Sequence, residues 1–202
     1  MARLNVNPTR MELKKLKARL TTAVRGHKLL KDKSDEMVRR FTGLVKRNMQ
    51  LRREVEREIS ATLRSFKVAR SVTPAYRAET AFSMPAESVS LECGVACIMG
   101  VDIPKITVTE RAASSLPYAY PELTSEADAA VKEAGALLPK MIELAEVEKT
   151  VRLLAAEIER NKRRVNALEF VMIPQLEETI AYIKGKLDEN ERAAIIRLMK
   201  VK

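Results

Sequence analysis

One histidine, His27, lies in the stretch VRGHKLLKDKSDE at residues 24–36. A histidine that acts as a general base needs a nucleophile or a carboxylate held within hydrogen-bonding reach. On a helix the neighbours of His27 are Ala23, Leu30 and Lys31, and the chain has no second histidine for a metal site. We therefore interpret this stretch as helix and His27 as a structural polar residue.

Two cysteines, Cys93 and Cys97, lie four residues apart where apolar and polar residues alternate. On a strand they share a face but stand roughly 13 Å apart at 3.3 Å per residue, which is too far for a disulfide. A zinc site would need two more ligands of the right type and spacing, and His27 alone does not supply them. We predict two packed free thiols in a β-hairpin, with no metal and no cofactor.

The sequence motifs give little support for a phosphate-binding site. The pattern G-x-x-x-x-G-K-[ST] is absent, and Gly185-Lys186 has Ile180 where the first glycine should be. The basic cluster RNKRRVNALE (160–169) could grip phosphates, but it lacks the interleaved aromatic residues that stack on bases. An exposed helix face is the simpler interpretation, and contact of that face with a partner stays open. We predict that the chain is not itself an enzyme.

The net charge of +10 is unevenly distributed along the 202 residues. Residues 1–77 carry +14, residues 78–120 carry −3 and residues 121–202 carry −1. Such a basic segment favours an anionic partner, whether nucleic acid, lipid headgroup or acidic protein, and a solvated helix face is the alternative. A basic coiled coil that binds nucleic acid or acts as a structural adaptor is therefore a second hypothesis.

Targeting signals are not evident. No apolar run approaches the roughly 18 residues that span a bilayer, and the N-terminal MARLNVNPTR lacks the apolar stretch of a signal peptide. Two cysteines without an export signal are typical of a reducing cytosol. We expect a cytoplasmic protein without direct membrane insertion.

The first 70 residues predict one long helix that positions these groups. The stretch NPTRMELKKLKARL supplies a start, with Asn7 as cap and Pro8 in the first turn. From Leu13 to Val55 apolar residues recur over six heptads, the repeat of a left-handed coiled coil. The two rows are Leu13, Leu20, His27, Ser34, Phe41, Asn48 and Val55, and Leu16, Ala23, Leu30, Met37, Leu44 and Leu51.

Beyond Val55 we expect the seam to move to Ile59, Leu63 and Phe66, a local stutter. The C-terminal segment carries a second stripe, and one apolar stripe per helix demands a partner. Two stripes in one chain indicate an antiparallel hairpin of helices. The second stripe consists of Leu137, Met141, Leu144, Val151, Ala155, Ile158, Val165, Leu168, Met172, Leu176, Ile180, Ile183, Leu187, Ala194, Leu198 and Val201.

The middle of the chain differs, since it holds five of the eight prolines. Alternation from Val89 to Cys97, the turn MGVD and the stretch KITVTE predict a β-hairpin over about residues 88–110. We predict a mainly α fold, a long antiparallel two-helix coiled coil with a small inserted β-hairpin. Residues 1–202 would form a single elongated domain, with helices over 8–70 and 122–202 and a connecting region over 71–121.

Pro174 interrupts the helical pattern of FVMIPQLEETI, where it removes one hydrogen bond and bends the helix. If residue 4 pairs near residue 200, Pro174 lies opposite residues 28–32, within about a turn of Gly26 and His27. We therefore predict a coil bend at Gly26, His27 and Pro174.

Several segments resemble the D subunit of the rotary V-type (A/V-type) ATPases and ATP synthases. They are NPTRMELKKLKARL, RGHKLLKDKSDEM, LAEVEKT, RRVNALEFVMIPQLEETIAYIKGKLDENER and RLMKVK, and they span roughly the first 70 and last 65 residues. The middle matches loosely, through PAESVS and IMGVDIP, and the cysteine pair is not part of the pattern. Asn161 departs from a shorter Lys-Thr-Arg run, a departure that we expect to leave the coil seam untouched.

This resemblance implies a non-catalytic axle (rotor) of the central stalk, peripheral to the membrane. The coiled coil, with both chain ends at its tip, would enter the hexamer of catalytic A and non-catalytic B subunits. The F subunit would bind alongside, and a further subunit would link the stalk to the membrane ring that transports H⁺ or Na⁺, with no nucleic acid partner. Candidate tip residues that contact the hexamer are Arg3, Arg10, Lys14, Lys15, Arg197, Lys200 and Lys202.

Overall fold

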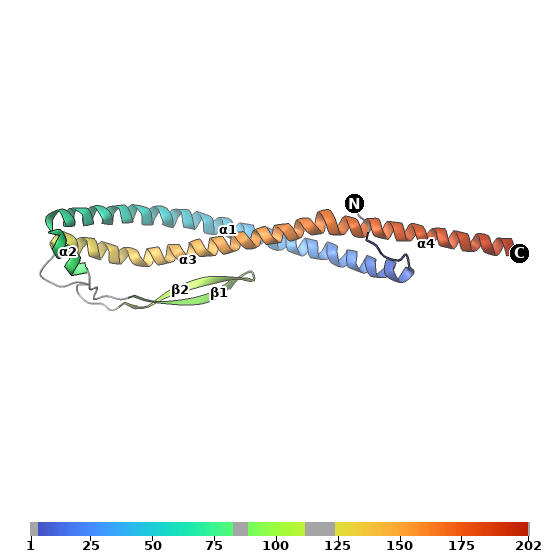
Figure 1. Ribbon diagram of the computed structural model, residues 1–202, viewed down its shortest axis with the longest axis horizontal. Coiled ribbons are helices and arrows are strands. Elements are labelled where there is room, and N and C mark those ends of the chain that lie inside the picture. Colours follow the sequence, from blue (N-terminus) through green and yellow to red (C-terminus); the bar gives the residue numbers. More distant parts are fainter. Residues whose placement is uncertain (1–3, 83–88, 112–123, 202) are drawn as a thin grey trace. The chain divides into compact units, whose positions relative to one another are not determined.

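The computed structural model describes residues 4–82, 89–111 and 124–201 (Figure 1). The elements in chain order are α1 (Arg10–Val72), α2 (Ala75–Phe82), β1 (Val89–Ile98), β2 (Val101–Arg111), α3 (Ser125–Ala167), the π-helical segment η1 (Leu168–Met172) and α4 (Ile173–Val201). The predicted fold class is confirmed: two long helical stretches, α1 and α3–α4, with a two-stranded antiparallel sheet inserted between them in the sequence.

The chain divides into two compact units, and the long helices contribute to both. Unit 1 consists of Met1–Val38 and Glu157–Lys202, and unit 2 consists of Arg39–Ala156. In unit 1 the first half of α1 lies beside the end of α3, η1 and α4 (Figure 1). In unit 2 the second half of α1 lies beside α3.

The first helix begins at a cap that differs from the predicted one. Thr9 Oγ1 accepts a hydrogen bond from the Glu12 N–H at 3.2 Å, which is the bond that an N-cap makes to the third helical residue. Thr9, and not Asn7, is therefore the cap. The Thr9 N–H donates to the Asn7 carbonyl at 2.9 Å, and the Leu4 N–H donates to Thr179 Oγ1 at 3.2 Å. The N-terminal segment of unit 1 thus turns back onto α4.

The heptad rows of α1 are confirmed from Leu13 to Val55. Every position in the two predicted rows is buried or half-buried. Leu16 and Val55 are each 2 % exposed and Met37 is 0 % exposed. Burial of a large aliphatic side chain contributes about 1.5–3 kcal/mol, so the seam supplies much of the stability of the helix pair.

The predicted stutter through Ile59, Leu63 and Phe66 is wrong at two of its three positions, since only Ile59 is half-buried. Leu63 is 54 % exposed and Phe66 is 37 % exposed, so neither lies in the seam. The positions that continue the seven-residue spacing remain buried or half-buried; they are Glu58, Thr62, Ser65 and Ala69. The heptad register therefore continues with polar and small residues. The sequence prediction selected Leu63 and Phe66 because they are apolar, although both side chains face outward.

The predicted stripe of α3 and α4 is correct in part. Leu137, Val165, Leu176 and Ile183 are all buried, whereas Met141, Ala155, Met172, Ala194 and Leu198 are exposed. The side chain of Val201 lies outside the described residues. Other buried positions were missed; they are Ala127, Ala130, Val147, Thr150, Leu154, Asn161 and Thr179.

Buried threonines explain part of this difference. Thr150 Oγ1 donates to the Glu146 carbonyl at 2.8 Å, and Thr179 Oγ1 donates to the Gln175 carbonyl at 2.6 Å. A threonine hydroxyl that donates a hydrogen bond to the carbonyl one turn earlier has its hydrogen-bonding requirement met within its own helix. Threonine can therefore occupy a seam position that a hydrophobicity pattern assigns to solvent.

The end of α1 and the start of α3 meet in unit 2. The Thr73 N–H donates to the Ala69 carbonyl at 3.0 Å. Pro74 follows and prevents α1 from continuing. Thr73 Oγ1 lies 3.3 Å from Thr124 Oγ1. The Thr124 carbonyl in turn accepts hydrogen bonds from the first turn of α3.

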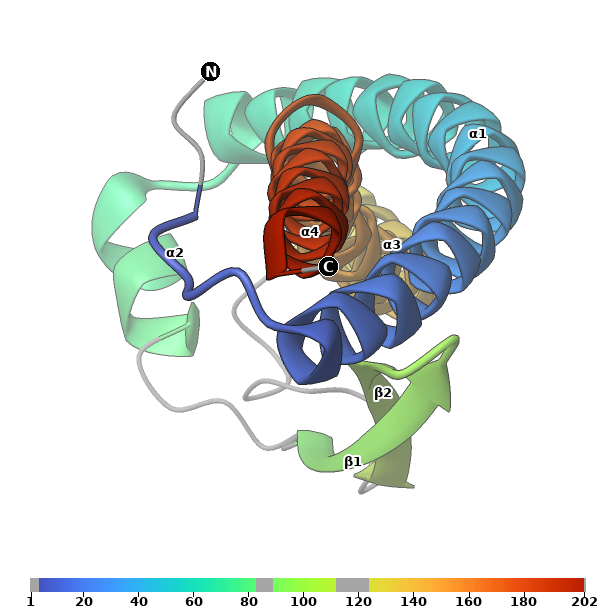
Figure 2. The same ribbon diagram turned by 90° about the vertical axis from the view of Figure 1, so that its right-hand side faces the viewer.

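The hairpin turns within the predicted stretch MGVD, but the turn is only two residues long, because Val101 and Asp102 already belong to β2. Met99 and Gly100 have φ angles of 54° and 83°, both left-handed, as a type I′ turn between twisted strands requires. The strands pair from Ile98 and Val101 at the turn to Val89 and Arg111 at the open end. Figure 2 shows the twist of the two strands about each other.

The two faces of the hairpin differ in exposure. Val101 and Ile103 are each 8 % exposed on one face, whereas Leu91 and Val95 on the other face are 49 % and 76 % exposed. A hydrogen bond from the Ile106 N–H to Glu146 Oε2, 2.9 Å long, fastens β2 to α3. Cys93 and Cys97 belong to the exposed face and are free and exposed, so the prediction of packed thiols is wrong.

Candidate functional site: the paired helix ends of unit 1

In unit 1, α4 extends beyond the start of α1. Arg10 is the first residue of α1, and its guanidinium forms an ion pair with Glu191 of α4. Because α4 runs to Val201, its last ten residues follow this pair. The end of α4 consequently extends past the start of α1 and is not paired with it.

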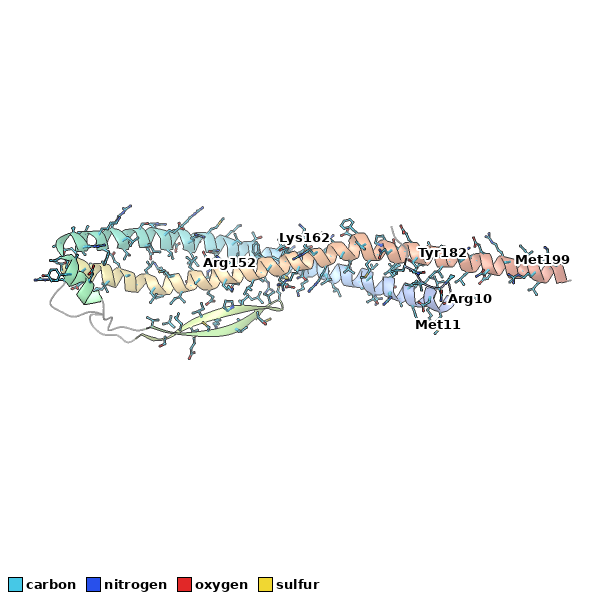
Figure 3. All side chains as sticks on the ribbon, in the orientation of Figure 1. Arg10, Met11, Arg152, Lys162, Tyr182 and Met199 are labelled. Atoms are coloured by element: carbon cyan, nitrogen blue, oxygen red, sulfur yellow. The ribbon has the colours of Figure 1, made fainter. Side chains whose placement is uncertain are left out.

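Apolar side chains cover this extension. Ile195 and Ile196 are 52 % and 55 % exposed, and Leu198 and Met199 are each 72 % exposed. Met199 projects away from the helix near the C-terminus (Figure 3). The expectation that Leu198 packs in the seam is therefore wrong, because α4 has already passed the start of α1.

The predicted tip cations have varied surroundings. Lys15 Nζ lies 2.9 Å from Glu12 Oε1, and Arg10 pairs with Glu191. Lys14, Arg197 and Lys200 are exposed, while Arg3 and Lys202 lie outside the described residues. Sequence reasoning grouped the cations and missed both acidic partners: Glu12 lies one turn away on the same helix, and Glu191 lies on α4, where its position depends on the pairing register.

A further ion pair lies on the exposed surface of α4. Lys186 Nζ is 2.8 Å from Glu189 Oε2. The hydrogen bond from Lys186 holds the pKa of the Glu189 carboxyl below its usual range, and the same bond raises the pKa of Lys186. Both groups are ionised near neutral pH, so this surface combines charges of both signs with apolar side chains.

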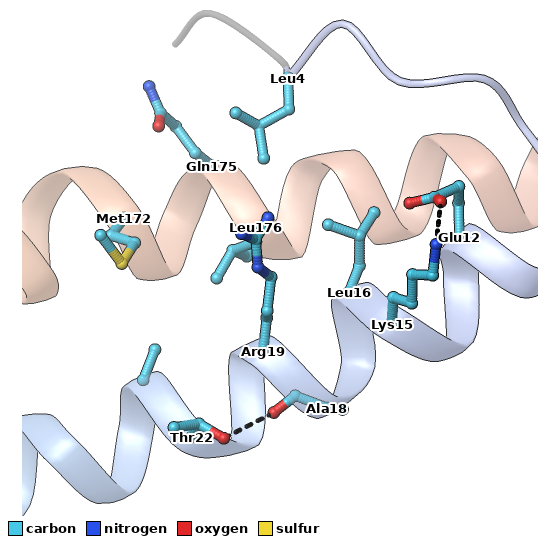
Figure 4. A pocket seen from close by; sticks show the side chains of 11 residues that line it. Leu4, Glu12, Lys15, Leu16, Ala18, Arg19, Thr22, Met172, Gln175 and Leu176 are labelled. Atoms are coloured by element: carbon cyan, nitrogen blue, oxygen red, sulfur yellow. Dashed lines mark hydrogen bonds and ion pairs between the residues drawn. The ribbon is translucent and has the colours of Figure 1, made fainter.

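An open groove of about 960 Å³ lies between α1 and α4 (Figure 4). Its apolar lining includes Leu4, Leu16, Met172 and Leu176, and Arg19 stands among them. The backbone of Leu4 is held by Thr179. The N-terminal segment therefore contributes to the same apolar surface as the two helices.

His27 has a partner that the sequence did not indicate. His27 Nε2 lies 3.4 Å from Glu169 Oε2 of η1, and the two side chains are 19 % and 46 % exposed. A carboxylate on the second helix could have been located only from the correct pairing register. The pair is a contact between the two helices at a half-buried seam position.

Pro174 lies farther along the helix pair than predicted. The groove brings its neighbours Met172 and Gln175 close to Thr22 and Ala23, and not to residues 28–32. The prediction paired residue 4 with a residue near 200, whereas Leu4 contacts Thr179. Residue 4 was therefore a wrong anchor for the predicted register, because the chain before α1 turns back along α4.

The π-helical segment η1 immediately precedes Pro174. The Ile173 N–H donates to the Leu168 carbonyl, a bond that spans one residue more than in an α-helix. Pro174 has no N–H and clashes with the carbonyl four residues earlier. Such a π-helical turn is a common way for a long helix to accommodate an irregularity.

Comparison with known proteins places the chain in a family. The family model for the D subunit of ATP synthases matches residues 12–202. The chain belongs to the ATP synthase D-subunit family.

Several similar proteins are named as D subunits of V-type ATP synthases. The protein from Clostridium novyi (strain NT) is 53 % identical over 206 residues, covering 100 % of this chain and 95 % of the relative. The protein from Clostridium botulinum (strain ATCC 19397 / Type A) is 50 % identical over 204 residues, covering 99 % and 94 %. The protein from Thermoanaerobacter sp. (strain X514) is 50 % identical over 203 residues, covering 100 % and 97 %. As a D-subunit family member, the chain is an accessory component of a complex with other subunits.

Asn161 lies in the seam. At this residue the D-subunit sequence departs from the Lys-Thr-Arg run that the resemblance led us to expect. Its side chain is 1 % exposed, and Nδ2 donates to Met37 Sδ at 3.4 Å. The expectation that this departure leaves the seam untouched is wrong. A thioether sulfur is a weak acceptor, so Asn161 forms a weakly satisfied polar layer next to the fully buried Met37.

The basic cluster around Asn161 is largely paired along its own helix. Arg163 contacts Glu159 at 3.3 Å, and Arg160 contacts Glu157 at 3.6 Å. Lys162 points outward (Figure 3). This arrangement fits the simpler interpretation, an exposed helix face.

The part of this D-subunit family member that the structure describes contains neither a metal-binding group nor a membrane-spanning helix. Within residues 4–82, 89–111 and 124–201, no three His, Cys, Asp or Glu side chains form a group that could hold a metal ion. None of the helices in these ranges combines the length and the apolar character needed to cross a bilayer.

Proposed function

We propose that the chain is the central-stalk axle of a V-type (A/V-type) ATP synthase or ATPase. It would couple ATP hydrolysis or synthesis in a hexamer of catalytic A and non-catalytic B subunits to rotation of a membrane ring and transport of H⁺ or Na⁺. Membership of the ATP synthase D-subunit family over residues 12–202 is the observation that carries this proposal.

The paired helices support a mechanical role. A pair of helices transmits torque only if the two helices do not twist independently of each other. In unit 1 the seam around Leu16, Leu176 and Ile183 joins α1 to α4. In unit 2, ion pairs such as Arg47–Glu143 and Lys140–Glu58 join α1 to α3. These contacts make each helix pair turn as one body.

The extension of α4 is the proposed contact with the A/B hexamer. Four exposed apolar side chains, Ile195, Ile196, Leu198 and Met199, supply contact area. Since exposed ion pairs contribute only about 0–1 kcal/mol each, these apolar residues are expected to supply most of the binding free energy. The predicted tip cations would steer this end toward acidic surfaces; they are Arg3, Arg10, Lys14, Lys15, Arg197, Lys200 and Lys202.

The candidate bend remains part of this proposal. The π-helical turn at Leu168–Met172, followed by Pro174, interrupts the regular helix. Gly26 has no side chain, and a Cβ added there would meet nothing within 4 Å. A local irregularity at Gly26, His27 and Pro174 would let the axle adjust its curvature while its ends stay engaged.

The remaining roles follow from the same proposal. The axle would be non-catalytic and hold no cofactor, and it would be cytoplasmic and peripheral to the membrane. Its partners would be the A and B subunits, the F subunit and the subunit that links the stalk to the membrane ring. The sequence similarity to D subunits supports these assignments.

Reconstitution tests the proposal. Vesicles that contain the membrane ring are combined with the A/B hexamer and the other stalk subunits, with or without this chain. We expect ATP-driven ion transport only when the chain is present, while ATP hydrolysis by the isolated hexamer continues without it. Transport of equal rate in the absence of the chain would exclude the axle.

A further inference from the structure

The outer surface of α1 in unit 2 carries a row of cations. Seven basic residues between positions 39 and 70 lie on the side of α1 away from its seam, and all seven are exposed; they are Arg39, Lys46, Arg53, Arg57, Arg64, Lys67 and Arg70. We call these seven residues the basic stripe. Glu56 is the one acidic residue at the corresponding outer heptad positions.

The spacing of the basic stripe follows from the heptad register. Asn48, Val55 and Thr62 lie in the seam. The heptad position on the opposite side of the helix holds a cation in four heptads. Residues seven apart on a helix are separated by about 10.5 Å along its axis. Four of the cations therefore lie in a row along one helix, with Ser60 at the same heptad position between Arg53 and Lys67. The residues at the opposite position are Arg39, Lys46, Arg53 and Lys67.

The basic stripe is not neutralised within unit 2. The neighbouring Arg47 pairs with Glu143, and Arg52 lies 3.5 Å from Glu148 and 3.0 Å from Glu56. These contacts engage Glu143, Glu148 and Glu56, while Glu54 accepts a hydrogen bond from Gln50. Across the part of the chain that the structure describes, no ion pair joins an acidic residue to a member of the stripe.

The stripe is confined to the second half of α1. The outer heptad positions of residues 10–38 carry both signs of charge; they include Lys14, Lys15, Arg25 and Lys28, but also Asp32, Asp35 and Glu36. A long helix that only needed solubility could use mixed charges throughout. The excess of cations at the outer positions of residues 39–70, where Glu56 is the one acidic residue, therefore indicates a partner of the opposite sign.

Apolar side chains lie among the cations of the stripe. Met49 is 58 % exposed and Leu63 is 54 % exposed. A shallow hollow of about 400 Å³ lies at the stripe, and one carboxylate stands among its cations. Its lining residues are Lys46, Met49, Gln50, Arg53, Glu54 and Arg57. A phosphate backbone gains nothing from apolar contact, whereas a protein surface with apolar residues among its carboxylates matches both features.

We propose that the basic stripe is a docking surface for an acidic helix of another subunit of the same complex. That helix would lie along α1, with carboxylates at seven-residue spacing facing the stripe and apolar side chains against Met49 and Leu63. The inference rests on the proposed function, because it takes the partner to be a stalk or head subunit.

A zero-length carbodiimide crosslinker tests the contact directly, since it joins only an amine and a carboxylate that already touch. The complex is isolated through a tag on the full-length chain, treated with the reagent and digested for mass spectrometry. Lys46 and Lys67 are expected to link to Asp or Glu residues in an acidic helical segment of another subunit. The exposed Lys132 and Lys149 of α3 serve as internal references and should yield few such links.

A charge-reversal variant gives the second measurement. Lys46→Glu, Arg53→Glu, Arg57→Glu and Arg64→Glu are combined in one chain. Binding of the crosslinked subunit should weaken by about 100-fold in this variant and by less than about threefold in a matched control, because four exposed ion pairs are replaced by repulsive contacts. The control carries the same charge change at exposed lysines outside the stripe, namely Lys132→Glu, Lys149→Glu, Lys162→Glu and Lys184→Glu.

The outcomes separate the two proposals. If the tagged wild-type chain recovers no ATPase subunits, the proposed function fails. If the complex is recovered, but Lys46 and Lys67 form no links and both variants bind equally, the docking surface alone is wrong. Duplex DNA of about 20 base pairs is a separate probe of the isolated chain. Tight binding that only the stripe variant loses, without crosslinks to other subunits, would replace the proposed partner with nucleic acid.

Discussion

Units 1 and 2 use the same heptad repeat but place different chemistry around it. In unit 1 the seam contains an aliphatic cluster around Ile183, and the helix end beyond Glu191 exposes apolar side chains. In unit 2 the later seam positions are polar or small, cross-helix ion pairs flank them, and a hairpin is fastened to α3. The repeat determines that the helices pair, whereas the residues outside it distinguish the two surfaces.

The largest expected effect is loss of a seam side chain in either unit. Ile183→Ala in unit 1 and Leu154→Ala in unit 2 remove side chains that are 0 % and 1 % exposed. Each substitution should lower the free energy of unfolding by about 2–5 kcal/mol, measured by urea denaturation. Hydrogen exchange should show the loss of protection mainly in the unit that carries the substitution.

The matched surface control is Lys149→Ala, which should change the free energy of unfolding by less than about 0.5 kcal/mol. A similar small change in Ile183→Ala or Leu154→Ala would contradict the seam described above. Equal loss of protection in both units would show that they unfold together.

Truncation before Ile195 should separate stability from engagement. Removal of Ile195–Lys202 takes away four exposed apolar side chains, so the free energy of unfolding should change by less than about 0.5 kcal/mol. ATP-driven transport by the reconstituted complex should fall about tenfold or more, since these side chains can each contribute roughly 1.5–3 kcal/mol when a partner buries them.

The matched control keeps the apolar residues and removes the charges, as Arg197→Gln, Lys200→Gln and Lys202→Gln. It should reduce transport by less than about threefold, because exposed ion pairs are weak. If the control were as damaging as truncation, charge and not apolar contact would dominate at this end.

Hairpin removal should have a smaller effect on the helices. Replacing residues 89–111 with a short Gly-Ser linker removes the bond from Ile106 to Glu146, a charge-assisted hydrogen bond worth about 1.5–3 kcal/mol. Circular dichroism should retain the helical signal, with a modest decrease in thermal stability. Unfolding of the long helices after this deletion would mean that the hairpin is part of their core.

Sequence periodicity predicted the elements better than their mutual register. The heptads from Leu13 to Val55 and the turn at Met99 and Gly100 depend on local spacing, and both are present. The partners of His27 and Asn161 depend on how α1 pairs with α3 and α4. No local pattern encodes that register, nor the return of the N-terminal segment to Thr179.

Exposed apolar residues were the second source of error. Leu63, Phe66 and Leu198 fit an apolar stripe by type, yet the structure exposes them. In the same long helices Thr150, Thr179 and Asn161 are buried. Hydrophobicity alone cannot distinguish a seam side chain from one that faces outward.

The smallest effect is expected at His27. His27→Gln keeps a polar group near Glu169 and removes one half-exposed pair, so the free energy of unfolding should change by less than about 1 kcal/mol and coupling should be retained. Glu169→Gln is the matched control and should behave alike in thermal denaturation. Abolished ATP hydrolysis in His27→Gln alone would require a role beyond helix pairing.

Single-molecule rotation tests the axle most directly. The chain has two cysteines, both exposed on the hairpin, so Cys93→Ser leaves Cys97 for attachment of a bead through biotin-maleimide. With the A/B hexamer fixed to glass, we predict unidirectional rotation of the bead on addition of ATP, and arrest when ATP is withdrawn. A stationary bead on complexes that still hydrolyse ATP and transport ions would contradict the proposal that this chain is the rotating axle.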